Sequence, residues 1–142
     1  MKKQELFQYI DDHRDEMMAL WQELVNRESG SADKDGVDKV QARIKKILEA
    51  EGATVRMVEY ETAGNMLIAE IDGDPAQAPV LFLGHVDTVF KTGTAEKRPF
   101  TVRDGKAYGP GVLDMKGGVV AFLYAIKALR AAGFSERPIK VV

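Results

Sequence analysis

The chain has 142 residues, and its 20 Lys and Arg against 22 Asp and Glu give a formal net charge of -2. This length corresponds to about one domain, and the 45% hydrophobic and 30% charged content predicts a folded core rather than disorder. The near balance of charge gives no support for a nucleic-acid or anionic-membrane partner. Because cysteine is absent, disulfide scaffolds, thiol catalysis and cysteine-ligated metals are excluded, so any metal must be held by histidine and carboxylates.

The beginning of the chain does not resemble a targeting signal. Residues 4–16 contain several acids and no apolar core, unlike a secretory signal peptide. No stretch approaches the roughly 18 apolar residues of a membrane span. We therefore expect a cytoplasmic protein without a membrane partner.

The first periodic segment predicts an amphipathic helix. Apolar residues between Leu6 and Val25 fall mostly on one face at helical spacing. His13 lies among charged residues on the polar side of this helix, so we expect a solvated surface histidine rather than a ligand.

A second helix is predicted after the polar connector 29–36. Apolar residues at steps of three and four occupy positions 37–48. Asp33 or Asp35 can cap the start of this helix, and Gly52 is typical of a helix end.

The pattern then changes to that of strands. Segments 54–60 and 65–71 are rich in β-branched and apolar residues and predict a hairpin. The continuously apolar segment 79–83 predicts a strand buried on both faces of a sheet covered by helices.

The last third of the chain combines a hairpin, a helix and a strand. Asp104-Gly105 between 100–103 and 106–108 favours a two-residue hairpin turn. The apolar run 119–132 predicts a well-buried helix, and 138–142 predicts a strand. A strand, a helix and a strand in this order indicate a parallel pair, so we predict a three-layer α/β/α domain with a mixed, partly parallel sheet.

His85 and Asp87 follow the predicted strand 79–83 and are the first candidates for chemistry. Residues two apart in extended chain point to the same side, and ligands bind beyond the carboxyl ends of strands in open α/β sheets. The pair suits a metal site, because imidazole and carboxylate are zinc ligands. A hydrogen-bonded pair with no ligand is an equally good interpretation of these two residues alone.

Asp114 strengthens the metal hypothesis. It stands between glycine-rich segments just before the predicted helix, at the same edge as His85. An Asp here can be a helix N-cap, but glycines on both sides indicate unusual backbone angles or a close approach. A phosphate at Lys116-Gly117-Gly118, at the helix start, is the second interpretation.

Two motifs resemble the N-terminal signatures of the dizinc peptidase/deacylase family: Leu83-Gly84-His85-Val86-Asp87-Thr88-Val89 and Ala107-Tyr108-Gly109-Pro110-Gly111-Val112-Leu113-Asp114-Met115-Lys116-Gly117-Gly118. This family includes glutamate carboxypeptidase, acetylornithine deacetylase, succinyl-diaminopimelate desuccinylase, aminoacylase and peptidase T. Tyr108-Gly109-Pro110-Gly111 and Lys97-Arg98-Pro99-Phe100 are most similar to the glutamate carboxypeptidase branch.

The resemblance implies a role for each candidate residue. His85 would be a ligand of one zinc, and Asp114 would bridge two zinc ions, for which cobalt or manganese can substitute. Asp87 would be the catalytic-site carboxylate that orients His85 and raises its basicity. The family also implies a cis peptide after the bridging aspartate, here Asp114-Met115.

The implied reaction is the zinc-dependent hydrolysis of a peptide or N-acyl amino acid amide beside a free carboxylate, with C-terminal glutamate among the groups released. The family's general-base glutamate, its remaining zinc ligands and its lid domain, through which the parent would form a homodimer, have no match in 1–142. We therefore interpret 1–142 as the N-terminal portion of a zinc-peptidase catalytic domain, truncated at its C-terminal side and inactive alone. The alternatives are a non-catalytic α/β binding module and a phosphate-binding domain that uses the glycine-rich segment.

Overall fold

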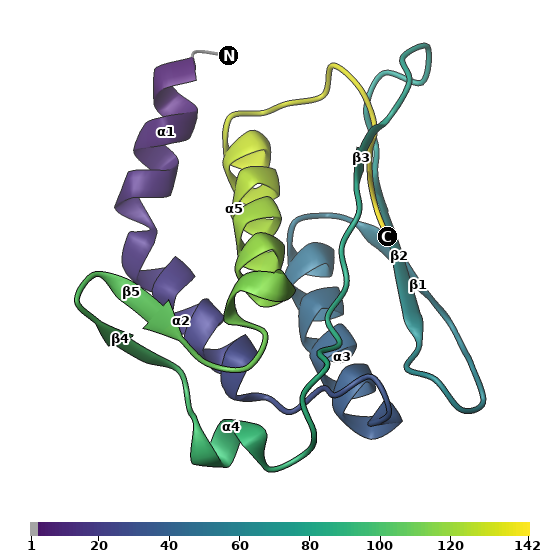
Figure 1. The fold of residues 1–142 in the computed structure, drawn as a ribbon. Helices are drawn as coiled ribbons and strands as arrows, with labels where there is room; N and C mark the ends of the chain where they lie inside the picture. The colour runs from purple at the N-terminus through teal and green to yellow at the C-terminus, as the bar shows by residue number, and fades with distance from the viewer. Residues whose placement is uncertain (1–2) are drawn as a thin grey trace.

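The computed structural model describes residues 3–142 as an α/β fold (Figure 1). Its elements in chain order are α1 (Lys3–Asp12), α2 (Arg14–Asn26), α3 (Lys34–Ala50), β1 (Thr54–Val58), β2 (Met66–Ile71), β3 (Val80–Phe82), α4 (Thr94–Lys97), β4 (Thr101–Arg103), β5 (Lys106–Tyr108), the π-type turn η1 (Val112–Lys116), α5 (Gly117–Ala131) and β6 (Ile139–Val141). Among residues 3–142, no helix has both the length and the apolar character needed to cross a bilayer.

Four strands form a mixed sheet in the order β1-β2-β6-β3. β1 pairs antiparallel with β2, and β2 pairs antiparallel with β6. β6 pairs parallel with β3, with Val80 opposite Ile139. The α/β class, the hairpin and the parallel pair predicted from the sequence are therefore confirmed, and β4 and β5 form the predicted second hairpin.

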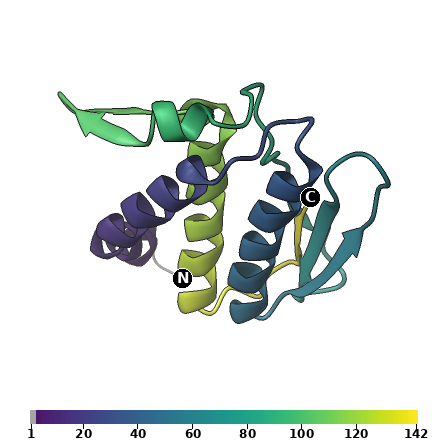
Figure 2. The ribbon, with the colours of Figure 1, turned by 90° about the horizontal axis from the view of Figure 1, so that it is seen from below.

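The helices lie on one side of this sheet (Figures 1 and 2). α3 packs on β1 and β2, whereas α1 and α2 pack on the side of α5 that faces away from the sheet. The core between these layers includes the fully buried residues Leu24, Val40, Leu48, Ala69, Leu123 and Ile126. Within residues 3–142 no helix covers the opposite face of the sheet, where Lys140 pairs with Glu70 at 2.7 Å. Residues 3–142 thus form two of the three predicted layers, the sheet and the helices on one of its faces. The helices of the other face are not among these residues.

The prediction that segment 79–83 is buried on both faces is wrong. β3 is the last strand in the order of the sheet, and Leu81 and Leu83 are 51% and 65% exposed. Val80 and Phe82, by contrast, are half-buried, and the Phe82 ring lies 5.9 Å from that of Phe122 on α5. A run of apolar residues predicts apolar contacts on each face, but only one face of β3 has a helix beside it in this chain.

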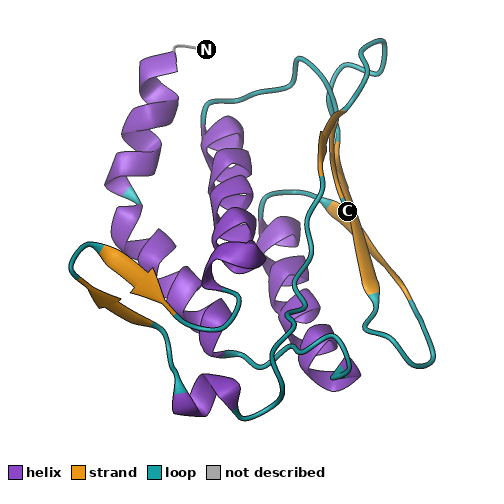
Figure 3. Ribbon diagram, in the orientation of Figure 1, coloured by secondary structure: helices purple, strands orange, loops and turns teal. Residues whose placement is uncertain are grey.

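The single N-terminal helix predicted from the sequence is instead two helices, which meet at His13 (Figure 3). His13 has φ −104° and ψ 15°, outside the helical range. Its Nδ1 donates to the Tyr9 carbonyl oxygen at 2.7 Å, and its ring stacks on Tyr9 with centroids 3.9 Å apart. A side chain that bonds to a nearby carbonyl competes with the helical pattern. His13 is therefore half-buried against Tyr9 rather than freely solvated.

Several local signals in the sequence are confirmed. Asp33 caps α3 by accepting a hydrogen bond from the Gly36 amide at 3.0 Å. Gly52 follows α3 with φ +85°, as a helix-ending glycine does. Asp104 and Gly105 both have positive φ in the turn between β4 and β5, which is the backbone that the Asp-Gly signal favours.

Candidate functional site

The chain beyond β3 carries His85 and Asp87 across the ends of the helices. The parallel pairing with β6 continues past the strand itself, because the Gly84 amide donates to the Val142 carbonyl at 3.0 Å. Farther on, the Thr88 amide donates to the Ser29 carbonyl at 2.8 Å. We call residues 83–88 the strand end. It is held at both ends by backbone hydrogen bonds, so His85 and Asp87 lie on a fixed length of chain.

Asp114 lies in the second element of the site, the turn made by residues 109–116. Asp114 itself has φ −116° and ψ 98°, outside helical values, and the Asp114-Met115 peptide is cis, as the resemblance implied. α5 begins only at Gly117, so Asp114 is not its N-cap. Gly111 has φ +71°, and a Cβ there would lie 2.5 Å from Cγ2 of Thr88. The glycines thus allow this turn to approach the strand end closely, as expected.

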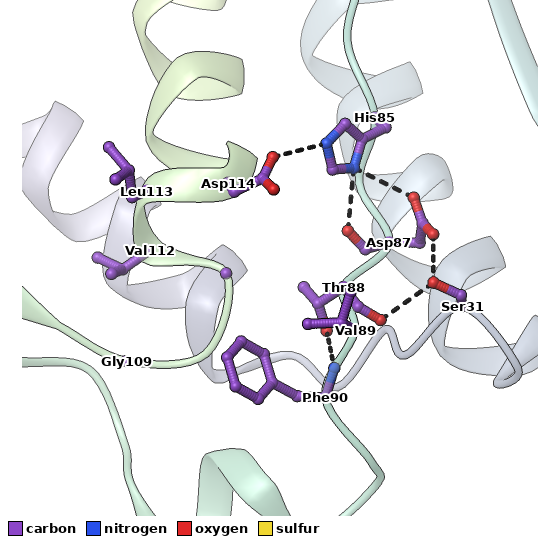
Figure 4. Close-up of a pocket in the computed structure, with 11 residues that line it drawn as sticks. Ser31, His85, Asp87, Thr88, Val89, Phe90, Gly109, Val112, Leu113 and Asp114 are labelled. Carbon is purple, nitrogen blue, oxygen red and sulfur yellow. Dashed lines mark hydrogen bonds and ion pairs between the residues drawn. The ribbon is translucent and has the colours of Figure 1, made fainter.

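The three predicted site residues meet at one place, as Figure 4 shows. Nε2 of His85 lies 2.9 Å from Oδ1 of Asp114. Nδ1 of His85 lies 3.1 Å from the carbonyl oxygen of Asp87 and 3.2 Å from its Oδ1. The prediction that these residues cluster at one edge of the sheet is confirmed. Their roles as metal ligands and as an orienting carboxylate stay predictions.

The two carboxylates control the charge of His85. Partial burial lowers the pKa of the imidazole, but the hydrogen bond with Asp114 and the hydrogen bond and charge of Asp87 outweigh it, so the His85 pKa is raised above its ordinary value. Asp114 lies at Nε2 and Asp87 at Nδ1, so the protonated ring can donate on both sides. The neutral imidazole carries one ring proton, so Asp114 and Asp87 are both placed to accept it.

A pocket of about 300 Å³ opens beside these residues. Its lining combines Ser31, His85, Asp87 and Asp114 with apolar side chains that follow the strand end, Val89 and Phe90, and with those of the turn, Val112 and Leu113. Val89 and Leu113 are 90% and 87% exposed, although both are apolar. The pocket is therefore polar at the histidine and apolar at its rim, an arrangement typical of small-molecule sites.

The histidine nitrogen and carboxylate oxygens in the pocket are the kinds of atom that bind a metal such as zinc. Zinc in proteins is bound by histidine nitrogen and carboxylate oxygen, and Nε2 of His85 and Oδ1 of Asp114 converge. Metal-bound histidines usually donate their other ring nitrogen to a carboxylate or carbonyl, and Asp87 occupies this place. Within residues 3–142, no cluster of three or more His, Cys, Asp or Glu side chains that could hold a metal occurs. These residues thus supply two convergent donors and the carboxylate behind one of them.

The structure contradicts the phosphate interpretation of Lys116-Gly117-Gly118. The Lys116 side chain is 1% exposed, and its Nζ donates to the Arg27 carbonyl oxygen at 2.8 Å. Burial lowers the pKa of this ammonium to about 8, against the opposing charge of Glu28. At Gly117 a Cβ would lie 3.2 Å from the Trp21 ring. The start of α5 is therefore covered by α2 and its lysine faces inward, away from any phosphate in solvent.

Ser31 is a site residue that the sequence analysis did not identify. Its hydroxyl donates to Oδ2 of Asp87 at 2.5 Å and also lies 3.1 Å from the Thr88 carbonyl (Figure 4). It belongs to the polar segment 29–36, whose composition predicts only a loop. No spacing rule could have found it, because only the fold brings Ser31 beside Asp87.

Residues 81–142 match the family model described as peptidase family M20/M25/M40. Among curated proteins, the chain is 32% identical over 133 residues to carboxypeptidase G2 from Pseudomonas sp. (strain RS-16), covering 92% of this chain and 32% of that protein. It is 35% identical over 118 residues to succinyl-diaminopimelate desuccinylase from Pseudoalteromonas atlantica, covering 80% of this chain and 30% of that protein.

The fold is also similar to that of solved structures. Human carnosine dipeptidase 1 matches with a TM-score of 0.83 and 29% sequence identity, over 97% of this chain and 33% of that one. The chain spans about a third of the length of the relatives it matches. The resemblance to the peptidase/deacylase family predicted from the two motifs is confirmed.

Proposed function

We propose that this chain, as a relative of the M20 peptidases, contributes metal ligands to an enzyme that hydrolyses peptide or N-acyl amino acid amide bonds. The observation that carries the proposal is the convergence of Nε2 of His85 on Oδ1 of Asp114, with Asp87 at the other ring nitrogen. The names of the relatives support a hydrolase, because they include a carboxypeptidase, a desuccinylase and a dipeptidase.

Each side chain has one task in this proposal. His85 would hold one zinc through Nε2, and Asp114 would be the carboxylate shared with a second zinc, with cobalt or manganese as substitutes. Asp87 keeps the proton of the imidazole on Nδ1, so that Nε2 stays free for the metal and the ring stays in position. Bound zinc supplies Lewis-acid chemistry, which lowers the pKa of water and polarises a carbonyl group.

In this proposal the substrate lies in the pocket. The amide to be cleaved sits over His85 and Asp114, and the exposed Val89 and Leu113 contact apolar atoms of the substrate at the rim. Burying these side chains under the substrate removes apolar surface from water and excludes bulk solvent from the reacting amide. Carboxypeptidase and deacylase activity, with release of C-terminal glutamate, is the form of the reaction that we propose.

A chimera tests this proposal. The chain replaces the matched third of carboxypeptidase G2, and hydrolysis of an acyl-glutamate substrate is measured with and without added zinc. We expect zinc-dependent hydrolysis by the chimera and none at a useful rate by the chain alone, since loss of general acid–base help alone costs roughly 10²–10⁴-fold.

The matched control is the same chimera with His85→Ala, compared with His13→Ala, because His13 is the chain's other histidine and lies on the N-terminal helices. Activity must disappear with the first substitution and persist with the second. A folded chimera that binds zinc but has no activity would contradict the proposal and favour a non-catalytic binding module.

A further inference from the structure

Residues 27–31, which we call the connector from here on, are part of the chain between α2 and α3 and contact both the strand end and the turn that carries Asp114. The connector lies far from both halves in sequence. It runs beside the strand end like a short parallel strand, with a β-bridge between Gly30 and Thr88. The Thr88 amide donates to the Ser29 carbonyl at 2.8 Å, and the Ser31 amide donates to the Thr88 carbonyl at 2.9 Å. The position of the strand end therefore depends on the connector.

The connector also holds the strand end through side chains. The buried hydroxyl of Ser29 donates to the Val86 carbonyl at 2.8 Å. Ser31 donates to Oδ2 of Asp87, which leaves Oδ1 of the same carboxylate to face Nδ1 of His85. A chain of contacts thus runs from Ser31 through Asp87 to His85. A hydrogen bond to a charged carboxylate is stronger than one between neutral groups, so Ser31 restricts the rotation of Asp87.

On its other side, the connector holds the turn that carries Asp114. Nζ of the fully buried Lys116 donates to the carbonyl oxygen of Arg27, which is the C-cap residue of α2. Carbonyl groups at a helix C-terminus carry partial negative charge, which favours a cation there. Trp21 adds a second tie, because its indole N–H donates to the Val112 carbonyl at 3.0 Å. The turn is therefore fastened to the end of α2 on both sides of Asp114.

Burial of Lys116 calls for an explanation beyond packing. A charged ammonium is costly to remove from water unless it is paired, and an apolar side chain of similar length would fill the same space. Besides its charge, which faces that of Glu28, the lysine differs from such a residue in its bond to the Arg27 carbonyl, which ties the turn to the connector. The same connector sets the strand end, so the separation of Asp114 and His85 is determined through it.

We propose that Ser31 and Lys116 are positioning residues. Through the connector they keep the His85 ring and the Asp114 carboxylate at the distance and orientation in which both can contact one metal ion; we call this arrangement their register. This inference rests on the proposed function, since the register matters for chemistry only if the two side chains share a metal. Ser31 acts on the orientation of Asp87 and so of the His85 ring. Lys116 acts on the location of the turn and so of the Asp114 carboxylate.

The experiment compares variants of the full chain by two measurements. The first is the affinity for zinc, determined by adding zinc and monitoring the NMR signals of the His85 ring. The second is the ¹⁵N chemical shift of the His85 ring nitrogens without zinc at one fixed pH, with Asp114→Ala and Asp87→Ala as references for lost contacts. The variants are Lys116→Met, Ser31→Ala and Ser31→Thr, which restores the hydroxyl. Lys127→Met is the matched control, because Lys127 lies on the same α5 and pairs with Glu51 at 3.5 Å, away from the site.

We expect Lys116→Met and Ser31→Ala each to weaken zinc binding by roughly 10- to 100-fold, as for other residues that orient metal ligands. Without zinc, Lys116→Met should move the Nε2 shift toward that of Asp114→Ala, and Ser31→Ala should move the Nδ1 shift toward that of Asp87→Ala. Ser31→Thr should restore both values, and Lys127→Met should change neither.

The inference would be overturned if the His85 ring shifts of both Lys116→Met and Ser31→Ala equalled those of the unmodified chain. It would also be overturned if Lys116→Met and Lys127→Met had equal effects. If Lys116→Met unfolds the chain, the inference is tested by Ser31→Ala and Ser31→Thr, because Ser31 is exposed and its replacement should leave the fold intact. If the unmodified chain binds no zinc under any condition, the proposed function fails, and the metal-free ring shifts still decide the positioning inference.

Discussion

The two halves of the candidate site are held in place by different means. On the strand end, His85 and Asp87 are 45% and 40% exposed and are oriented by hydrogen bonds among side chains at the surface. On the turn, Asp114 is 85% exposed, and within residues 3–142 its side-chain hydrogen bond is the one with His85. Its position comes from the buried Lys116 and from Trp21, which fasten the backbone on either side.

The two halves therefore differ in what their contacts fix: the rotation of side chains on the strand end, and the location of the backbone on the turn. A surface network sets the rotation of a ring and a carboxylate, and its members can be replaced without disturbing the core. A buried tie sets the location of a whole turn, and its loss costs the desolvation of groups left without partners. We therefore expect loss of a buried tie such as Lys116 to affect both folding and binding. Changes to the exposed side chains of the site should affect binding alone.

The largest effect is expected from Asp114→Ala. It removes one of the two convergent donors, so zinc binding by the chain should fall below detection in calorimetry, and zinc-dependent hydrolysis by the chimera should be abolished. The thermal midpoint should stay near that of the unmodified chain, because Asp114 is exposed. Asp35→Ala, at another exposed aspartate, is the control, and a chimera whose activity is indifferent to Asp114→Ala would contradict the assignment.

Asp87→Asn should have the next largest effect. The ring of His85 would keep a partner at Nδ1 but lose the charged one, so zinc should still bind with affinity lowered by roughly 10- to 100-fold. Calorimetry measures this change. Full loss of binding would mean that Asp87 is itself a ligand, and an unchanged affinity would mean that it does not orient His85.

Trp21→Phe tests the turn by keeping an aromatic ring and removing the indole N–H that donates to Val112. We expect a loss of about 1 kcal/mol in the free energy of unfolding, the usual contribution of one hydrogen bond, measured by urea titration. Amide exchange should become faster at Lys116, whose N–H donates to Gly111 within the same turn. Faster exchange throughout β2 instead would indicate general loosening rather than release of the turn.

The smallest effect concerns Glu23 on α2, which lies outside both halves. Two hydrogen bonds from Arg43, at 2.9 and 3.2 Å, hold the pKa of this carboxyl below its ordinary value, and Arg27 adds to the effect. A lowered pKa means that the pair stabilises the fold above the ordinary glutamate pKa, and that this stability disappears as pH falls through the lowered pKa.

Because the pair is partly exposed, we expect Glu23→Gln to reduce unfolding free energy by less than about 1 kcal/mol at pH 7. The difference from the unmodified chain should vanish at pH values below the lowered pKa. Urea titrations at the two pH values check both statements, and an equal difference at low and neutral pH would contradict the role of the charge.

Short-range signals in the amino-acid sequence were enough to predict most local elements of the protein. The cap at Asp33, the turn at Asp104-Gly105 and the helix after Gly117 depend on short-range backbone preferences, which a sequence displays directly. His85, Asp87 and Asp114 were also identified from the sequence, because their residue types, their glycine neighbours and the resemblance all point to the same chemistry.

Long-range packing, which the sequence does not display, determines which faces are buried and which residues support the site. Leu81 was predicted to be buried, yet it is half exposed, because burial depends on which strand ends up at the edge of the sheet. Ser31 and Lys116 carry no signal that spacing could reveal, since their partners Asp87 and Arg27 are distant in sequence. Residue types set what each side chain can do, but long-range packing sets which groups it meets, and the register of this site depends on that packing.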